Sequence, residues 1–150
     1  MNEISIFNVA KYIVDKLGSM TTMKLQKLTY YCQAWSLAWD DIPLFQEDFQ
    51  AWANGPVCYE LYQKHSGLFI IDEQFLSDYC YTQFNNAQLE TIDTVLTAYG
   101  EETPLELSNR THNELPWLQA RAGVEEGVRS RNIIHKTTMQ EYYGSQIPVT

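Results

Sequence analysis

The chain has 150 residues, of which 45% are hydrophobic and 19% are charged, a composition typical of a folded globular protein. Its length suits a single domain, residues 1–150, that can bury a core without metal ions or disulfides. The net charge of −9 is concentrated in residues 28–109, where thirteen acidic residues accompany one basic residue, Lys64. A segment this acidic disfavours nucleic-acid binding.

Hydropathy and cysteine usage indicate where the protein resides. The longest purely apolar run is Leu68–Ile71, so we expect no membrane-spanning segment. No basic segment followed by an apolar stretch begins the chain, and the three cysteines are odd in number and unevenly spaced. We therefore expect a cytoplasmic protein with free thiols.

Two helices are predicted in the first part of the chain. Apolar residues at helical spacing from Ile6 to Leu17, followed by Gly18, predict an amphipathic helix. A second helix follows a capping threonine, Thr21 or Thr22. Its apolar face repeats at spacings of three and four residues and comprises Leu25, Leu28, Cys32, Trp35 and Trp39. We interpret this face as core rather than as the lining of a ligand pocket.

A small β element is predicted next. Asp40–Pro43 ends the second helix, and Leu44–Phe45 and Phe49–Trp52 are typical of short extended segments around an acidic turn. Asn54-Gly55-Pro56 predicts a turn that places Pro56 at the first position of a third helix, which runs to Gly67. The expected fold is mainly α: a compact multi-helix domain with a small β element between the second and third helices.

The second half of the chain predicts further short helices. Residues 68–84 are expected to be mostly irregular, with one short strand or helix. Asn85 or Asn86 caps a helix that Gly100 ends, and Thr103–Glu106 is a capping box for the following helix. Residues 125–136 predict an exposed connection, and Thr138–Glu141 a second capping box before a helix that ends at Gly144.

The stretch Leu107–Trp117, LSNRTHNELPW, raises the possibility of a zinc site. His112, Glu114 and Pro116 match the start of a zinc deaminase signature, but such a site also needs a Pro-Cys-x-x-Cys, and no cysteine follows Glu114. His65 and His135 stand alone, and the chain has no Gly-rich phosphate loop. We therefore predict that the protein is not an enzyme and binds neither a metal nor a cofactor.

A structural interpretation of the same stretch is better supported. Asn113 can cap a helix that begins at Glu114, and Pro116 then falls in the first turn, where its missing N–H is harmless. Trp117 should face inward, Thr111 should complete the preceding turn, and His112 should hydrogen-bond a neighbouring loop.

Several motifs together resemble one family. In chain order they are Asn8–Ala10, Met23–Trp35 (MKLQKLTYYCQAW), Pro43–Phe45, Phe49–Trp52, Gly55-Pro56-Val57, Thr111-His112 and Pro116-Trp117. This succession resembles the Panacea domain, the family of SocA-like and GepA-like antitoxins, over nearly the whole chain. Cys58-Tyr59 stand where the family often has a proline.

The resemblance implies the antitoxin of a toxin–antitoxin pair, of a kind common on prophages and other mobile elements. Such a protein neutralises a cognate toxin, encoded by the adjacent gene, by direct contact. An alternative is an adaptor that delivers a bound protein to an energy-dependent protease, and another is an enzyme with an unrecognised site.

The segment from Asp40 to Tyr62 is the predicted toxin-facing surface. It holds more aromatic rings than one thin β element can bury, and exposed rings often anchor protein interfaces. The predicted anchors are Phe45, Phe49, Trp52, Tyr59 and Tyr62. Acidic residues should steer a basic partner towards them: Asp40, Asp41, Glu47 and Asp48.

Overall fold

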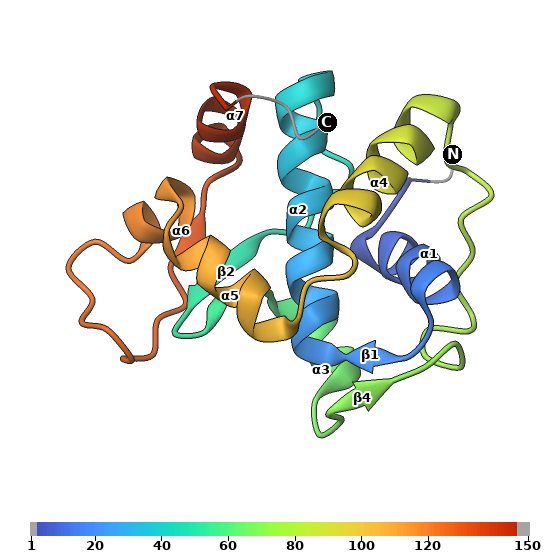
Figure 1. The fold of residues 1–150 in the computed structure, drawn as a ribbon, viewed down its shortest axis with the longest axis horizontal. Coiled ribbons are helices and arrows are strands. Elements are labelled where there is room, and N and C mark those ends of the chain that lie inside the picture. The colour runs from blue at the N-terminus through green and yellow to red at the C-terminus, as the bar shows by residue number, and fades with distance from the viewer. Residues whose placement is uncertain (1–2, 147–150) are drawn as a thin grey trace.

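The structure is a computed structural model that describes residues 3–146, and these residues are mainly helical, as predicted (Figure 1). Within this range no helix is both long enough and apolar enough to cross a bilayer. The helices are α1 (Ile6–Leu17), α2 (Thr22–Asp40), α3 (Tyr59–His65), α4 (Asn86–Tyr99), α5 (Pro104–His112), α6 (Leu115–Ala120) and α7 (Lys136–Gly144).

Helix α2 runs through the middle of the molecule, and α1, α4, α5 and α7 pack around it (Figure 1). It begins where the Thr21 side chain accepts a hydrogen bond from the Lys24 amide, 3.1 Å away, and it ends at Asp41, which adopts a left-handed conformation with φ of 59°. Because neighbours cover it on several sides, polar and apolar residues alike are buried along most of its length.

The strands form two small antiparallel sheets. Strand β1 (Met20–Thr21) pairs with β4 (Ile70–Ile71), and β2 (Phe49–Trp52) lies between β3 (Gly55–Cys58) and β5 (Ile133–Ile134). The hairpin β2–β3 is the β element between α2 and α3. Strands β1, β3 and β5 were not predicted, whereas β4 lies in residues 68–84, where one short strand or helix was expected.

The prediction for residues 44–58 was partly wrong. Leu44–Phe45 forms no strand, and Pro56 lies in β3, opposite Ala51, instead of opening a helix. Gly55, with φ of 120°, allows the chain to reverse through two residues after Trp52. Since β3 is an edge strand, the missing N–H of Pro56 removes no essential ladder bond, and α3 starts three residues later than expected.

Most other predicted helix boundaries agree with the structure. The capping boxes at Asn85 and Thr103 are present, and Gly18 ends α1 with φ of 84°. Two boundaries were wrong: Glu114, not Asn113, is the N-cap of α6, and α7 begins at Lys136, before the capping box predicted at Thr138.

The centre of the core is aromatic. Leu25 and Leu28 are fully buried, and the Tyr31 ring stacks on the Tyr99 ring with centroids 4.3 Å apart. The indole N–H of Trp35 donates to the Tyr99 hydroxyl over 3.0 Å, which satisfies both buried polar groups. These contacts join α2 to α4, and Tyr143 of α7 completes the cluster against Tyr31.

Candidate binding site

A cavity of about 670 Å³ lies where the N-terminal end of α2 meets the β2–β3 turn, α3 and the loop before β5. Small-molecule sites usually measure about 300–1,000 Å³. Of the described residues that line this cavity none is acidic, although the chain carries a net charge of −9. Its basic residues are Lys27, His65, Arg129 and Arg131.

One wall of the cavity consists of aromatic rings. The ring centroid of Tyr62 lies 5.0 Å from that of Trp52 and 6.0 Å from that of Tyr59. The guanidinium of Arg131 lies 4.9 Å from the centroid of the Tyr59 ring, a distance at which a cation is attracted to the ring face. Three of the predicted toxin anchors therefore do lie together, but they line a cavity.

Lys27 reaches the cavity from α2. Only 1% of the residue is exposed, and burial alone lowers the pKa of its ammonium group from 10.5 to about 7. Within residues 3–146 we find no hydrogen bond or ion pair that involves this ammonium group. Lys27 is therefore a buried cationic group that has no counter-ion in the described part of the chain.

The backbone of β3 packs directly on the Lys27 side chain. A Cβ atom placed at Gly55 would lie 2.5 Å from Lys27 Cε and 3.0 Å from Thr111 Oγ1. Because Gly55 also has φ of 120°, both conformation and space require glycine here. The Gly-Pro-Val motif thus positions Lys27 as well as the hairpin.

Gln26 lines the cavity and links α2 to β3 and α3. Its side-chain carbonyl accepts from the Cys58 amide over 2.8 Å, and its amide nitrogen donates to the Cys58 carbonyl over 3.1 Å. The same nitrogen lies 3.0 Å from Nε2 of His65. Burial, and to a smaller extent the charge of Lys27, lowers the pKa of His65. The hairpin and α3 are therefore fixed to α2 beside Lys27.

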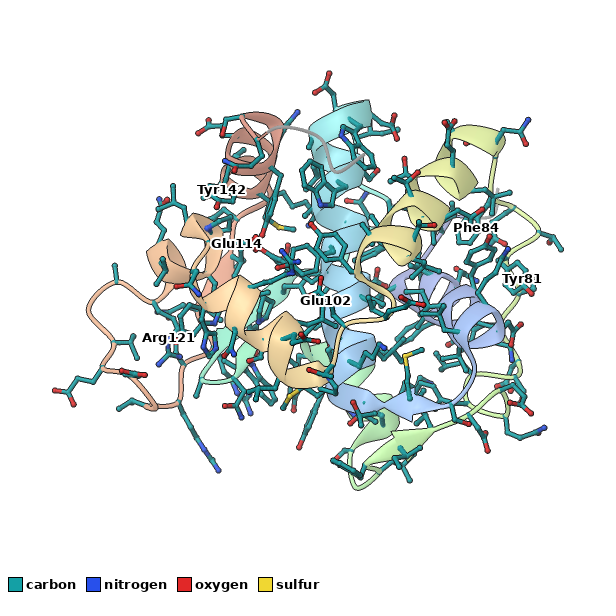
Figure 2. The ribbon with its side chains drawn as sticks, viewed as in Figure 1. Tyr81, Phe84, Glu102, Glu114, Arg121 and Tyr142 are labelled. Carbon is teal, nitrogen blue, oxygen red and sulfur yellow. The ribbon has the colours of Figure 1, made fainter. Side chains whose placement is uncertain are left out.

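Arg121 holds the loop that carries Arg129 and Arg131. Its guanidinium is buried, donates to the Ala51 carbonyl over 2.9 Å and to the Val128 carbonyl over 2.6 Å, and lies over the Trp117 ring. Figure 2 labels Arg121 beside the loop that follows α6. The loop is thus attached to β2, and its two exposed arginines lie at the cavity.

The stretch 107–117 supports the β2–β3 hairpin. The Ser108 hydroxyl donates to the Asn54 carbonyl over 2.6 Å, and the Trp117 indole donates to the Trp52 carbonyl over 2.9 Å. Thr111 is fully buried in the last turn of α5, and its carbonyl accepts from the Glu114 amide over 3.2 Å in the turn before α6. Pro116 lies in the first turn of α6, as expected.

His112 stacks on Trp117, with ring centroids 4.2 Å apart. Its Nε2 atom is buried and has no hydrogen-bond partner within residues 3–146. Burial, followed by the positive charges of Lys27 and Arg121, lowers the pKa of His112, and the Ala53 backbone in the β2–β3 turn acts in the opposite direction. A neutral imidazole on an indole face suits a packing role.

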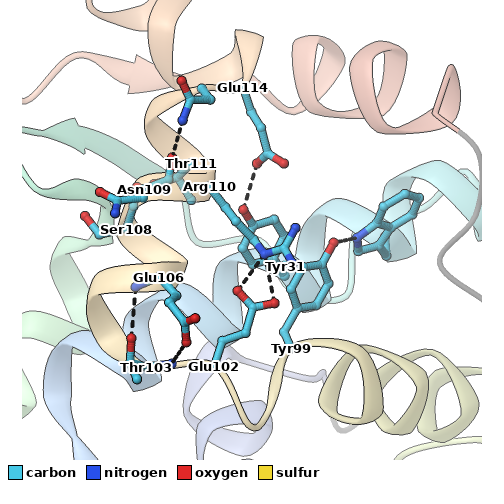
Figure 3. Close-up of polar contacts among 12 residues, drawn as sticks. Tyr31, Tyr99, Glu102, Thr103, Glu106, Ser108, Asn109, Arg110, Thr111 and Glu114 are labelled. Atoms are coloured by element: carbon cyan, nitrogen blue, oxygen red, sulfur yellow. Dashed lines mark hydrogen bonds and ion pairs between the residues drawn. The ribbon is translucent and has the colours of Figure 1, made fainter.

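Glu114 accepts hydrogen bonds from two buried tyrosines. Its carboxylate lies 2.7 Å from the Tyr31 hydroxyl and 2.8 Å from the Tyr143 hydroxyl. Figure 3 shows the first of these bonds beside the surface ion pair of Arg110 with Glu102. Burial raises the pKa of Glu114, although both tyrosine hydrogen bonds oppose that shift. Glu114 therefore connects α2, α6 and α7.

The two carboxylate hydrogen bonds lead to a stability prediction. Glu114→Ala should lower the free energy of unfolding by about 2–4 kcal/mol, because two buried hydroxyls lose their acceptor. The toxin neutralisation that the family resemblance implies should persist at a temperature where the variant is folded. Urea denaturation checks the first expectation, and Glu141→Ala, at an exposed position of α7, is the control. Loss of neutralisation at unchanged stability would show that Glu114 acts in function.

The described part of the chain contains no candidate metal site. Residues 3–146 contain no group of three or more His, Cys, Asp or Glu side chains that could hold a metal ion. His112 and Glu114 also face different partners, Trp117 and the tyrosine hydroxyls. That the protein uses no metal stays a prediction, which elemental analysis can test.

The structure does not bring Asp40 and Asp41 to the aromatic rings that line the cavity. Asp40 and Asp41 lie at the C-terminal end of α2, about 25 Å along the helix axis from Met23, which lines the cavity. Each acid also has a partner within the molecule: Asp40 accepts from Thr91, Asp41 from Gln140 and Glu47 from the Ile6 amide, and Asp48 pairs with Lys136.

Two predicted anchors are not on the surface at all. Phe45 is 1% exposed and Phe49 is 2% exposed, and their rings pack against each other with centroids 6.0 Å apart. Phe49 also meets Tyr30 edge-on. For these two rings the expectation of surface exposure was wrong, because Phe49 pairs with Ile134 of β5 and packs on α2, which sequence order did not reveal.

Comparison with known families identifies the class of protein. A family model described as "Antitoxin SocA-like, Panacea domain" matches residues 25–118, which is more than half of the chain. The chain therefore belongs to the SocA-like Panacea family, as its motifs indicated. Neither the curated proteins nor the solved structures contain a significant match to the chain. The matched segment runs from α2 into α6, whereas α1 and α7, which pack on α2, lie outside it.

Proposed function

We propose that this chain is the antitoxin of a toxin–antitoxin pair, acts as one Panacea domain, and neutralises a cognate protein toxin by direct binding. Membership of the SocA-like Panacea family carries this proposal, because the family description names antitoxins. The adjacent gene is the first place to seek the toxin.

An exposed apolar patch is the proposed toxin-facing surface. We call it the 68–70 patch: Leu68, Phe69 and Ile70, together with exposed Met23, which follows the Thr22 that bonds to Phe69. Phe69 is 74% exposed, and the Thr22 amide donates to its carbonyl over 3.0 Å, which holds the patch next to the cavity rim. Contiguous exposed apolar side chains on a folded protein often mark a protein interface. We place Tyr59 and Tyr62 at the edge of this surface.

A charged substitution in the patch should abolish neutralisation. Phe69→Glu places a carboxylate in an interface that must lose water, so the variant should neither rescue growth of cells that express the toxin nor capture the toxin in a pull-down. Its melting temperature should match that of the wild type, because the side chain is exposed.

Leu105→Glu is the matched control, since Leu105 is 69% exposed on α5. Equal neutralisation by the two variants would show that the toxin binds elsewhere. Failure of the wild-type protein to neutralise the adjacent gene's product would contradict the antitoxin function itself. Toxin levels that fall during rescue, instead of staying constant, would indicate delivery to a protease.

A further inference from the structure

The cavity contains a positive charge that toxin docking on the 68–70 patch does not use. Lys27 is 1% exposed, lines the cavity, and forms no ion pair within residues 3–146. Buried charges in proteins are normally paired, because an ammonium group without water or a counter-ion is unstable. The natural complement of this group is an anion that enters the cavity.

Further basic groups surround the same space. Arg129 and Arg131 lie on the loop that Arg121 attaches to β2, and His65 lines the cavity from α3. Neither arginine forms an ion pair in the described part of the chain. Arginine forks and a lysine ammonium together are a common way to hold a phosphate group.

The remaining wall suits a flat ring. Trp52 and Tyr62 meet with centroids 5.0 Å apart, and Tyr59 continues the aromatic surface. Nucleobases stack on such rings, and this stacking does not require a specific pattern of hydrogen bonds to the base. The cavity volume of about 670 Å³ is also in the range of small-molecule sites.

We propose that this cavity binds a small phosphorylated ligand with an aromatic ring, of the mononucleotide type. The phosphate group lies against Lys27 and the two arginines, and the ring lies against Trp52, Tyr59 and Tyr62. An acidic side chain from a protein partner would supply a single negative charge and would leave the aromatic wall unused. This binding activity is a different function from the proposed neutralisation of a toxin, although Met23, Tyr59 and Tyr62 border both surfaces.

Isothermal titration calorimetry of the full chain tests the proposal. The probes are AMP, GMP, CMP and UMP, each compared with its nucleoside and with inorganic phosphate. At least one mononucleotide should bind at one site, about tenfold or more tighter than its nucleoside and than phosphate alone, because the two parts of the ligand contact different walls.

Three variants assign the binding to the cavity. Lys27→Met and Arg131→Gln should each weaken mononucleotide binding by about tenfold or more. Lys24→Met, on the same helix but outside the cavity lining, should bind like the wild type. The proposal is overturned if no mononucleotide binds at millimolar concentration, or if Lys27→Met binds as well as Lys24→Met. Phe69→Glu should keep mononucleotide binding, so loss of toxin neutralisation and loss of ligand binding can be told apart.

Discussion

Lys27→Met is expected to raise the free energy of unfolding at neutral pH, and the gain should shrink as the pH rises. The side chain is buried on α2, and burial lowers the pKa of its ammonium group to about 7. Methionine has a similar length and no charge, so the variant keeps the packing against Gly55 without burying a cation.

The pH window follows from the two pKa values. In the unfolded chain Lys27 titrates at its ordinary value of 10.5, and in the folded protein at about 7. Between these values the unfolded state binds more protons, so wild-type stability should increase by about 1.4 kcal/mol per pH unit relative to Lys27→Met. Below about pH 7 the difference should reach about 3–5 kcal/mol and level off.

Urea denaturation at several pH values between 6 and 9 measures this difference. Burial, and to a smaller extent the charge of nearby Lys27, lowers the pKa values of His65 and His112, so both titrate below the range over which Lys27 titrates. Lys24→Met is the matched control, because its half-exposed side chain lies on the same helix. For each variant the quantity compared is its difference in free energy of unfolding from the wild type. If this difference changed as little with pH for Lys27→Met as for Lys24→Met, Lys27 would not be a buried cation.

Trp35→Ala is expected to leave most of the protein insoluble or unfolded. Truncation of a buried tryptophan typically costs about 3–5 kcal/mol, and a whole domain is stable by only about 5–15 kcal/mol. The loss here includes the Trp35–Tyr99 hydrogen bond and the packing of Trp35 on Tyr143. A hydroxyl of the aromatic core would therefore lose its donor at the same time as a cavity opens.

The soluble fraction and thermal melting by circular dichroism test this expectation. Trp39→Ala is the control, since Trp39 stacks on Trp35 but is only partly buried. Its effect should be clearly smaller. A soluble Trp35→Ala variant that melts cooperatively near the wild-type temperature would show that the indole does not hold α2 to α4.

The helices could be predicted because their signals are local. Capping side chains such as Asn85 and Thr103, and the apolar spacing in Ile6–Leu17, lie within a few residues of the structure they specify. Pro56 was misread because the same residue suits a first helical turn and an edge strand. Only the pairing of β2 with β3 decides between them.

The cavity could not be predicted because its parts are far apart in the sequence. Lys27 stands in a helix where a lysine would ordinarily face water, and Arg131 comes from a loop about a hundred residues later. The one available signal in the sequence was Gly55, because a glycine in a strand often marks a close approach of the backbone to another group. In the structure that group is Lys27. The sequence alone does not identify which side chain approaches Gly55.

The placement of β5 and α7 has a consequence for how the protein is made. Ile134 pairs with Phe49, and the Tyr143 hydroxyl lies 3.2 Å from that of Tyr30, 113 positions earlier. Contacts over such separations form late, because the intervening chain must first be synthesised and released by the ribosome. A nascent chain that has not reached Ile134 exposes the free edge of β2, which can pair with other chains. Cover of the β2 edge and the contact between Tyr30 and Tyr143 therefore depend on synthesis through β5 and α7.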